Sequence, residues 1–156
     1  MARASRSRVD YATLAELRYQ LRRFLGRREE AARAAGVEPQ QYALLLQLKG
    51  LEGRRTVPTI GALAERLQIR HHSAVELVDR LVARRMVDRR RNGHDGRAVE
   101  VALRPAGQAV LRRLALYSTA ELQTDGPELV NVLRRLIRQR RRTTSGSKSQ
   151  RKGGAR

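Results

Sequence analysis

Hydrophobic residues recur at steps of three and four over most of the chain, which predicts a mainly helical protein. The helices are expected to begin at or near Asp10, Pro39, Thr59, His72, Pro105 and Pro127. Gly36 is placed to end the first helix in the left-handed conformation, and Thr59 is a good N-cap for the third. The chain has 156 residues and no internal repeat, and this length predicts one compact domain.

Between the fourth and fifth helices the pattern changes to alternation, which predicts a β-hairpin. Residues 86–91 form the expected first strand and residues 98–103 its partner. The tip between them contains two turn dipeptides, Asn92-Gly93 and Asp95-Gly96. The third and fourth helices are separated by only a few residues, and the hairpin follows at once. This spacing is typical of a winged helix-turn-helix.

The charge of the chain indicates a phosphate-rich partner. Lys and Arg number 34 against 15 Asp and Glu, which gives a formal net charge of +19. Such an excess favours nucleic acids, although a basic surface that serves only solubility is the alternative. Aromatic residues make up only 3% of the chain, so stacking on single-stranded RNA is disfavoured.

Several classes of protein and site are excluded by what the sequence lacks. Without cysteine there are no disulfides and no thiolate metal sites. His71 and His72 are neighbours on a helix and point in different directions, so no metal site and no cofactor are expected. No catalytic triad, P-loop or dinucleotide fingerprint is found, so we do not expect an enzyme. No apolar run is long enough for a signal peptide or a membrane span, which predicts a cytoplasmic, nucleoid-associated protein.

The helix at residues 72–84 is the candidate for reading DNA. Its core face is expected to carry Ala74, Leu77, Val78 and Leu81, and its other face His72, Ser73, Glu76, Asp79 and Arg80. A helix-turn-helix usually presents the N-terminal end of its second helix to base edges. Histidine can donate to guanine, serine can pair with several bases, and Glu76 can accept from cytosine or orient an arginine. An ordinary solvated helix face is the alternative.

The hairpin is the second candidate for DNA contact. Arg97 is placed to reach the minor groove, whose negative potential attracts guanidinium groups. Asp95 is expected to hold Arg97, or Arg89 across the hairpin, by a charge-assisted hydrogen bond. Alternation along the strand should point Arg90 away from Arg89 and Arg91. The predicted DNA contacts are Arg70, His71, His72, Ser73, Glu76, Arg80, Arg89, Arg91, Asp95 and Arg97.

In this order, these features resemble the MarR family of winged helix-turn-helix regulators. The resemblance is carried by Leu63-Ala64-Glu65-Arg66-Leu67, by His71-His72-Ser73-Ala74-Val75, by Leu77-Val78-Asp79-Arg80-Leu81 and by Asp95-x-Arg97. It implies a mainly α fold with a small β-hairpin wing and with N- and C-terminal dimerisation helices. It further implies a homodimer on a pseudo-palindromic double-stranded DNA site, with helix 72–84 in the major groove and wing 89–97 in the minor groove.

The resemblance also implies a repressor that a small molecule releases from DNA. The effector pocket would be lined by the first, second and fifth helices, where Tyr11, Tyr19 and Tyr42 are the candidate residues. A nucleoid-associated architectural protein that binds DNA with little sequence preference is the alternative function. Neither the operator nor the effector is specified by the sequence.

The chain departs from the family pattern at the ends of its elements. Glycine is frequent in the family where Gln68 and Arg85 stand, and other residues adopt the left-handed turn at a cost of about 1 kcal/mol. Arg70 and Arg104 replace residues that would cap a helix. Because Arg70, Arg85 and Arg104 are cations where neutral residues are usual, we expect added phosphate contacts at these positions.

The chain is expected to contain one folded domain between two disordered basic ends. Residues 1–9 and 143–156 are basic and nearly without apolar residues, which predicts disorder. The domain at residues 10–142 contains a DNA-binding module at 57–104 and dimerisation helices at 10–35 and 105–142. Membrane association is not expected.

Overall fold

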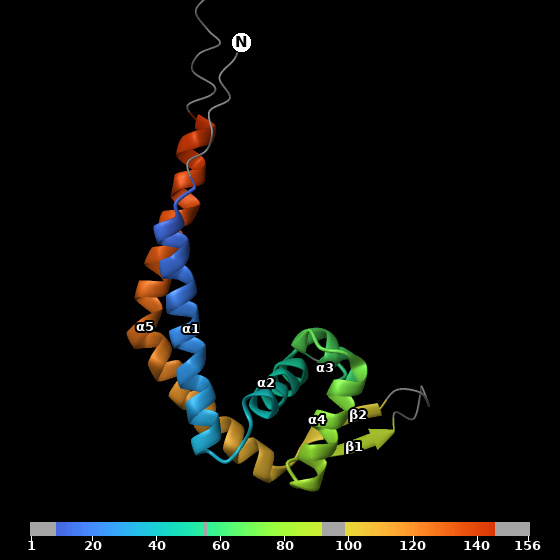
Figure 1. Cartoon of the computed structure of the whole chain (residues 1–156). Coiled ribbons are helices and arrows are strands. Elements are labelled where there is room, and N and C mark those ends of the chain that lie inside the picture. The colour runs from blue at the N-terminus through green and yellow to red at the C-terminus, as the bar shows by residue number, and fades with distance from the viewer. Residues whose placement is uncertain (1–8, 55, 92–98, 146–156) are drawn as a thin grey trace, which may run out of the picture. The chain divides into compact units, whose positions relative to one another are not determined.

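The computed structural model describes residues 9–54, 56–91 and 99–145, with side chains described as far as residue 138. The elements in chain order are α1 (Tyr11–Ala34), α2 (Pro39–Gly53), α3 (Ile60–Leu67), α4 (His71–Ala83), β1 (Val87–Arg91), β2 (Val99–Leu103) and α5 (Pro105–Ser145) (Figure 1). The mainly α architecture with a small β-hairpin is confirmed. The helix expected at residues 72–84 is α4, which begins at His71, one residue before the expected start.

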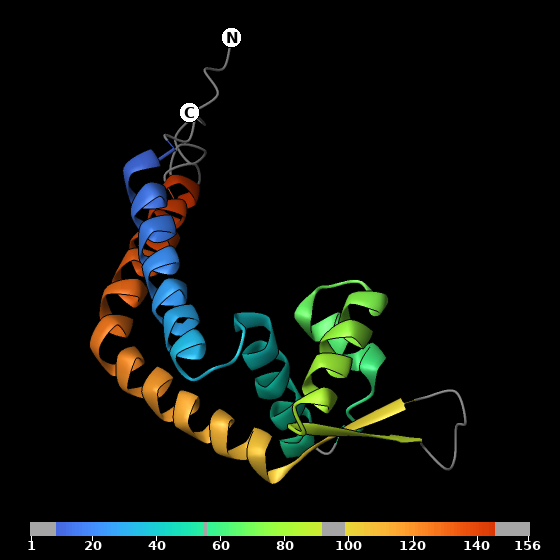
Figure 2. The same cartoon turned by 60° about the horizontal axis from the view of Figure 1, so that its bottom comes forward.

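The chain forms two compact units. The central unit comprises Arg27–Thr119, and the terminal unit comprises the residues up to Gly26 together with those from Ala120 onward. The central unit therefore holds the whole helix-turn-helix and hairpin. In the terminal unit, the first part of α1 runs alongside the last part of α5 (Figures 1 and 2). There the Nη2 of Arg23 lies 3.5 Å from the Oδ1 of Asp125, which joins the two helices.

Two expectations for the C-terminal part of the chain are wrong. The separate fifth and sixth helices are one helix, α5, with Pro127 inside it. A proline removes one hydrogen bond, but its φ of about −65° is helical, so a helix with many turns on either side can continue through it. In addition, α5 extends to Ser145, into the segment from residue 143 that was expected to be disordered.

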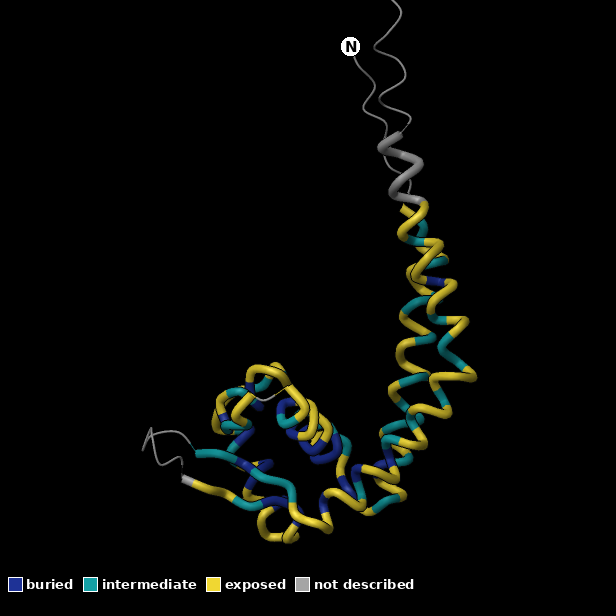
Figure 3. Tube along the Cα trace, turned by 180° about the vertical axis from the view of Figure 1, so that it is seen from behind, coloured by how far each residue is buried: buried dark blue, intermediate teal, exposed yellow. Residues whose placement is uncertain are grey.

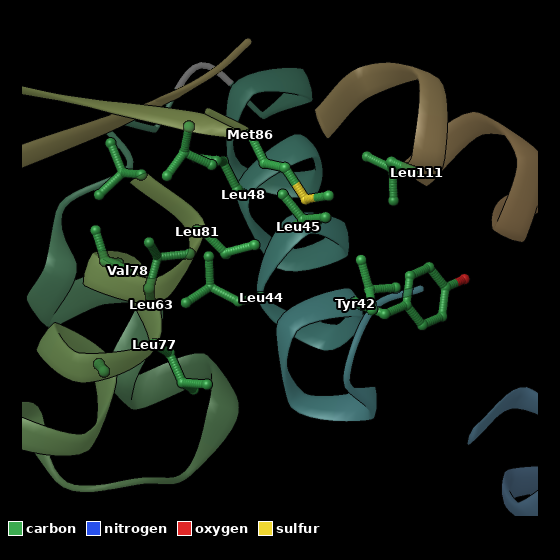
Figure 4. Packing of buried hydrophobic residues seen from close by; sticks show 14 of the residues in the cluster. Tyr42, Leu44, Leu45, Leu48, Leu63, Leu77, Val78, Leu81, Met86 and Leu111 are labelled. Atoms are coloured by element: carbon green, nitrogen blue, oxygen red, sulfur yellow. The ribbon is translucent and has the colours of Figure 1, made fainter. Parts of the chain in front are cut away.

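The core of the central unit forms where α2, α3, α4 and the hairpin meet (Figures 3 and 4). Apolar side chains from each element are almost completely excluded from solvent, namely Leu44, Leu45, Leu48, Leu63, Val78, Leu81, Val87 and Val101. Removing each of these aliphatic side chains from water contributes about 1.5–3 kcal/mol before entropy is subtracted. This core fixes α4 by one face and leaves its opposite face free for a partner.

Three turns in the central unit end their helices in the same way. Gly36, Gln68 and Arg85 have φ values of 76°, 54° and 56°, in the left-handed region. This conformation was expected from the residue type at Gly36 and from the family resemblance at Gln68 and Arg85. After each of them the next amide donates to a carbonyl five residues earlier, as from Ile69 to Ala64 at 3.1 Å and from Met86 to Leu81 at 2.9 Å. This is the Schellman arrangement, which satisfies helix-end carbonyls.

The hairpin is tied to the start of α3 as well as to α4. β1 and β2 pair antiparallel with Val87 opposite Leu103, Arg89 opposite Val101 and Arg91 opposite Val99. Before α3, the carbonyl of Pro58 accepts from the amide of Val101 at 2.9 Å. Figure 2 shows the two strands side by side beyond the end of α4. A backbone hydrogen bond thus joins the hairpin to the segment before α3.

Candidate nucleic-acid interface

Helix α4, the candidate recognition helix for DNA, has the two faces expected from its period. Ala74, Leu77, Val78 and Leu81 are buried, whereas His72, Glu76, Asp79 and Arg80 are exposed. Ser73 is half-buried. These four exposed side chains are polar or charged, so they can form hydrogen bonds and ion pairs with base edges or phosphates.

The N-terminal end of α4 is open to solvent. Arg70 is the N-cap residue, is exposed, and makes no side-chain capping bond, as the substitution of a capping residue implied. The first backbone N–H groups of a helix have no partner within the helix and attract anions. His71 is also exposed, beside a cavity of about 350 Å³ that Thr59, Val75 and Arg89 also line. Arg70 and His71 therefore lie at a helix N-terminus, whose partial positive charge attracts phosphate.

Both carboxylates on the exposed face of α4 lie beside arginines. The Oε2 of Glu76 is 3.8 Å from the Nη2 of Arg80, one turn further along the helix. The Oδ1 of Asp79 is 2.7 Å from the Nη2 of Arg89 on β1. This arrangement lowers the repulsion that two acidic groups would exert on a phosphate backbone.

The wing residues divide between described and undescribed positions. Arg89 is directly opposite the buried Val101 and so lies on the core side of the sheet, whereas Arg90 is opposite Glu100 on the other side. The alternation predicted for the arginine run is thus confirmed. Arg91 is the last residue of β1, and its side chain is not described. Asp95 and Arg97 lie outside the described residues, so the expected contact between them stays a prediction.

The three cations at element ends have different surroundings. Arg70 and Arg85 are exposed. Arg104 is exposed as well, but its Nη1 lies 3.0 Å from the Oδ1 of Asp88 on β1. This ion pair connects the residue before α5 to the hairpin. It engages one nitrogen of a guanidinium group that was expected to contact phosphate.

Two features of this surface were not found by the sequence reasoning. Asp79 was placed on the exposed face of α4 but was not given a partner, because nothing local indicates that β1 brings Arg89 beside it. Arg84, directly after α4, donates from Nη1 to the Oε1 of Gln41 at 3.0 Å and from Nη2 to the carbonyl of Gly36. Both contacts span more than 40 residues of sequence, so only the tertiary fold creates them.

Family comparison agrees with this architecture. Residues 35–98, which include α2, α3, α4 and β1, match the sequence model of the MarR family. This part of the chain is therefore similar to the MarR family. Solved structures with this fold include proteins described as MarR family transcription regulators. Among curated proteins, no sequence match to the chain was found.

Solved structures of MarR family proteins share the fold. AbsC, a transcriptional regulator from Streptomyces coelicolor, is 18% identical, with a TM-score of 0.66 over 89% of this chain and 98% of AbsC. The apo form of MarR from E. coli is 21% identical, with a TM-score of 0.61 over 84% and 96% of the two chains. A MepR variant from S. aureus bound to an oligodeoxyribonucleotide is 15% identical, with a TM-score of 0.60 over 90% and 99%.

Two further properties bear on the class of partner. Within the described segments, no helix is both long and apolar enough to span a membrane. Over the same residues, no three His, Asp or Glu side chains come together in a group that could hold a metal ion.

Proposed function

We propose that this protein is a member of the MarR family and a homodimeric transcription regulator that binds a pseudo-palindromic DNA site. The observation that carries the proposal is the exposed polar face of α4, which the buried opposite face holds in place beside the hairpin. An α-helix of this kind fits the major groove of B-DNA. Arg70, His71, His72, Ser73, Glu76 and Arg80 would contact the DNA there, and Arg89, Arg91, Asp95 and Arg97 would belong to the wing.

Electrostatics supports DNA as the partner. The formal net charge of +19 favours a polyanion, and phosphate contacts by Lys and Arg make such binding fall steeply with salt. The MepR variant with the same fold was solved with an oligodeoxyribonucleotide, which favours this chemistry for the present chain.

Dimerisation is proposed from apolar side chains that the single chain leaves exposed. In the terminal unit these include Leu14, Leu21, Leu133 and Ile137, between 39% and 62% exposed. Helices with uncovered apolar side chains need a second surface to cover them. A second copy of the chain would supply it and would place two recognition helices on two half-sites. Sedimentation at micromolar concentration should give twice the mass of one chain, and a folded monomer would contradict the proposal.

We further propose that a small-molecule effector releases the protein from DNA as a repressor. A groove of about 410 Å³ in the central unit lies between α1 and α5, lined by Arg27, Arg113, Leu114 and Tyr117 among others. Of the tyrosines named from the sequence, Tyr42 is 7% exposed and its hydroxyl lies 3.2 Å from the Oγ of Ser118, as expected of a packing residue. The groove, rather than Tyr42, is therefore the candidate site. Compounds that bind the protein and raise its melting temperature should weaken its affinity for DNA. If such compounds left the affinity for DNA unchanged, release by an effector would be contradicted.

The test of DNA binding is selection of duplexes from a random pool, followed by affinity measurements at physiological salt. The preferred duplex should bind at least about 10³-fold more tightly than random sequence, the range of specific regulators. Arg80→Gln should reduce this ratio. Arg33→Gln is the matched control, because Arg33 is a similarly exposed arginine that pairs with Glu29 one turn earlier on α1, as Arg80 pairs with Glu76 on α4. If Arg33→Gln reduced the ratio of selected to random affinity and Arg80→Gln did not, the proposed interface would be refuted.

The alternative function is an architectural protein that coats the nucleoid with little sequence preference. It is favoured by the same charge excess, which acts on any phosphate backbone. The affinity ratio separates the two functions, because a coating protein would bind the selected and random duplexes nearly equally. Genomic mapping of bound sites would then show discrete sites for a regulator and broad occupancy for a coating protein.

A further inference from the structure

We infer that Asp79 and Arg89 are positioning residues that fasten the wing to the recognition helix. The inference rests on the proposed function, since it assigns a role within the DNA-binding module. It also changes the role expected for Arg89, which the sequence placed among the direct DNA contacts. In the structure the guanidinium of Arg89 is engaged by α4.

Arg89 makes two contacts with α4 through one nitrogen. Its Nη2 lies 2.7 Å from the Oδ1 of Asp79 and donates to the carbonyl oxygen of Val75 at 3.2 Å. Val75 and Asp79 are four residues apart and therefore lie one helical turn apart on the same side of α4. Arg89 thus joins β1 to one full turn of the recognition helix.

The sheet register explains why Arg89 is directed at α4. Arg89 is opposite Val101, whose side chain is only 1% exposed, so both residues lie on the core side of the hairpin. Arg90 lies on the other side, opposite Glu100. The Nη2 of a guanidinium group carries two N–H donors in fixed directions and can serve a carboxylate and a carbonyl together, whereas an ammonium group is a point charge on a flexible stem.

This contact has a geometric consequence for binding. The major-groove helix and the wing must engage the same duplex at the same time, so the angle between them contributes to specificity. The carbonyl of Pro58 fixes β2 through Val101, and Arg89 fixes β1 to α4. Without Arg89 the wing would have more freedom relative to α4, and that freedom would be lost on binding as an entropic cost.

Two substitutions distinguish positioning from direct phosphate contact. If Arg89 positions the wing, Arg89→Gln and Asp79→Asn should each weaken binding to the selected duplex about tenfold, and the double variant should be no weaker than either. If Arg89 contacts phosphate instead, Asp79→Asn should tighten binding by removing a negative charge, and the effects should add. The sign of the Asp79→Asn effect therefore decides between the two roles.

Arg90→Gln is the matched control. It removes the same charge from the adjacent position of the same strand, on the face that does not meet α4. Arg90→Gln should lower the affinity for the selected duplex and for random duplexes by the same factor. Arg89→Gln should lower mainly the affinity for the selected duplex, and so reduce the ratio of the two affinities. Denaturant unfolding of each variant checks that the fold is kept. Arg89→Lys, which retains the charge but not the planar guanidinium with its fixed donor directions, should recover only part of the ratio.

A second measurement uses the free protein. Amide hydrogen exchange in Val87–Arg90 and Val99–Leu103 should become faster in Arg89→Gln and stay unchanged in Arg90→Gln. Additive effects on DNA affinity, or equal exchange rates in the two variants, would overturn the positioning role while leaving the proposed function intact. Failure of the wild type to bind duplex DNA would overturn both.

Discussion

The contact between Gly107 and Met86 predicts a large effect from a single methyl group. Gly107 is buried in the first turn of α5. A Cβ atom added there would lie 2.2 Å from the carbonyl oxygen of Met86 and 3.1 Å from its carbonyl carbon, where ordinary contacts begin near 3.4 Å. Both atoms belong to the backbone, so no side-chain rotation can relieve the clash and α5 must move by about 1 Å.

The cost of Gly107→Ala follows from the contacts that this movement disturbs. The Met86 carbonyl accepts from the amide of Arg104 at 2.9 Å, and losing this bond costs about 0.5–1.5 kcal/mol. Overpacking adds about 1–3 kcal/mol. Alanine has a better helix propensity than glycine, which offsets about 1 kcal/mol of this loss of stability. We therefore expect the free energy of unfolding to fall by about 0.5–3.5 kcal/mol.

Urea unfolding followed by circular dichroism measures this change, at one protein concentration because a dimer's stability depends on it. Gly50→Ala is the matched control, because Gly50 lies inside α2 and an added Cβ would meet nothing within 4 Å. It should stabilise the protein by about 0.5–1 kcal/mol. If Gly107→Ala were as stable as Gly50→Ala, the close approach of α5 to Met86 would be refuted.

Three further predictions use the turns, the wing and the C-terminal segment. Gln68→Gly and Arg85→Gly should each stabilise the protein by about 1 kcal/mol in the same unfolding assay, because their φ values are positive, and destabilisation by both would contradict the left-handed turns. Arg97→Ala should weaken specific DNA binding by about 1–3 kcal/mol, and Asp95→Ala should weaken it too, whereas tighter binding by Asp95→Ala would show that Asp95 does not organise the wing. Removal of residues 143–156 should flatten the dependence of log affinity on log salt and lower affinity for all duplexes alike, and a changed sequence preference would show that this segment reads bases.

The order and type of the elements in the central unit were predictable because the apolar period is local information. Ala74, Leu77, Val78 and Leu81 share a helix face by their spacing alone, and the structure buries them all. Thr59 was predictable as an N-cap for the same reason, and its Oγ1 accepts from the amide of Ala62 at 3.2 Å. Such features depend on residues within one or two turns.

Pro127 shows where local rules fail. Its residue type alone indicates the start of a helix, yet the helix continues through it. The energy of the many turns on either side outweighs one missing hydrogen bond, and a local signal contains no information about that balance.

Gln68 and Arg85 show a second limit. Neither residue type favours a left-handed turn, and only the family resemblance predicted one. After each turn, an apolar residue, Ile69 or Met86, donates back into the preceding helix, so burial and hydrogen bonding offset the strain.

In the candidate DNA-binding surface, some features were also predictable from the sequence and others were not. The sequence by itself determined which side of α4 faces outward and that Arg89 and Arg90 lie on opposite sides of their strand, because both follow from backbone periods. Only the tertiary structure decided that β1 packs with Arg89 against Asp79 and that Arg104 reaches Asp88. The register of the hairpin and its packing on α4 arise from contacts between distant segments, and no period within one segment encodes them.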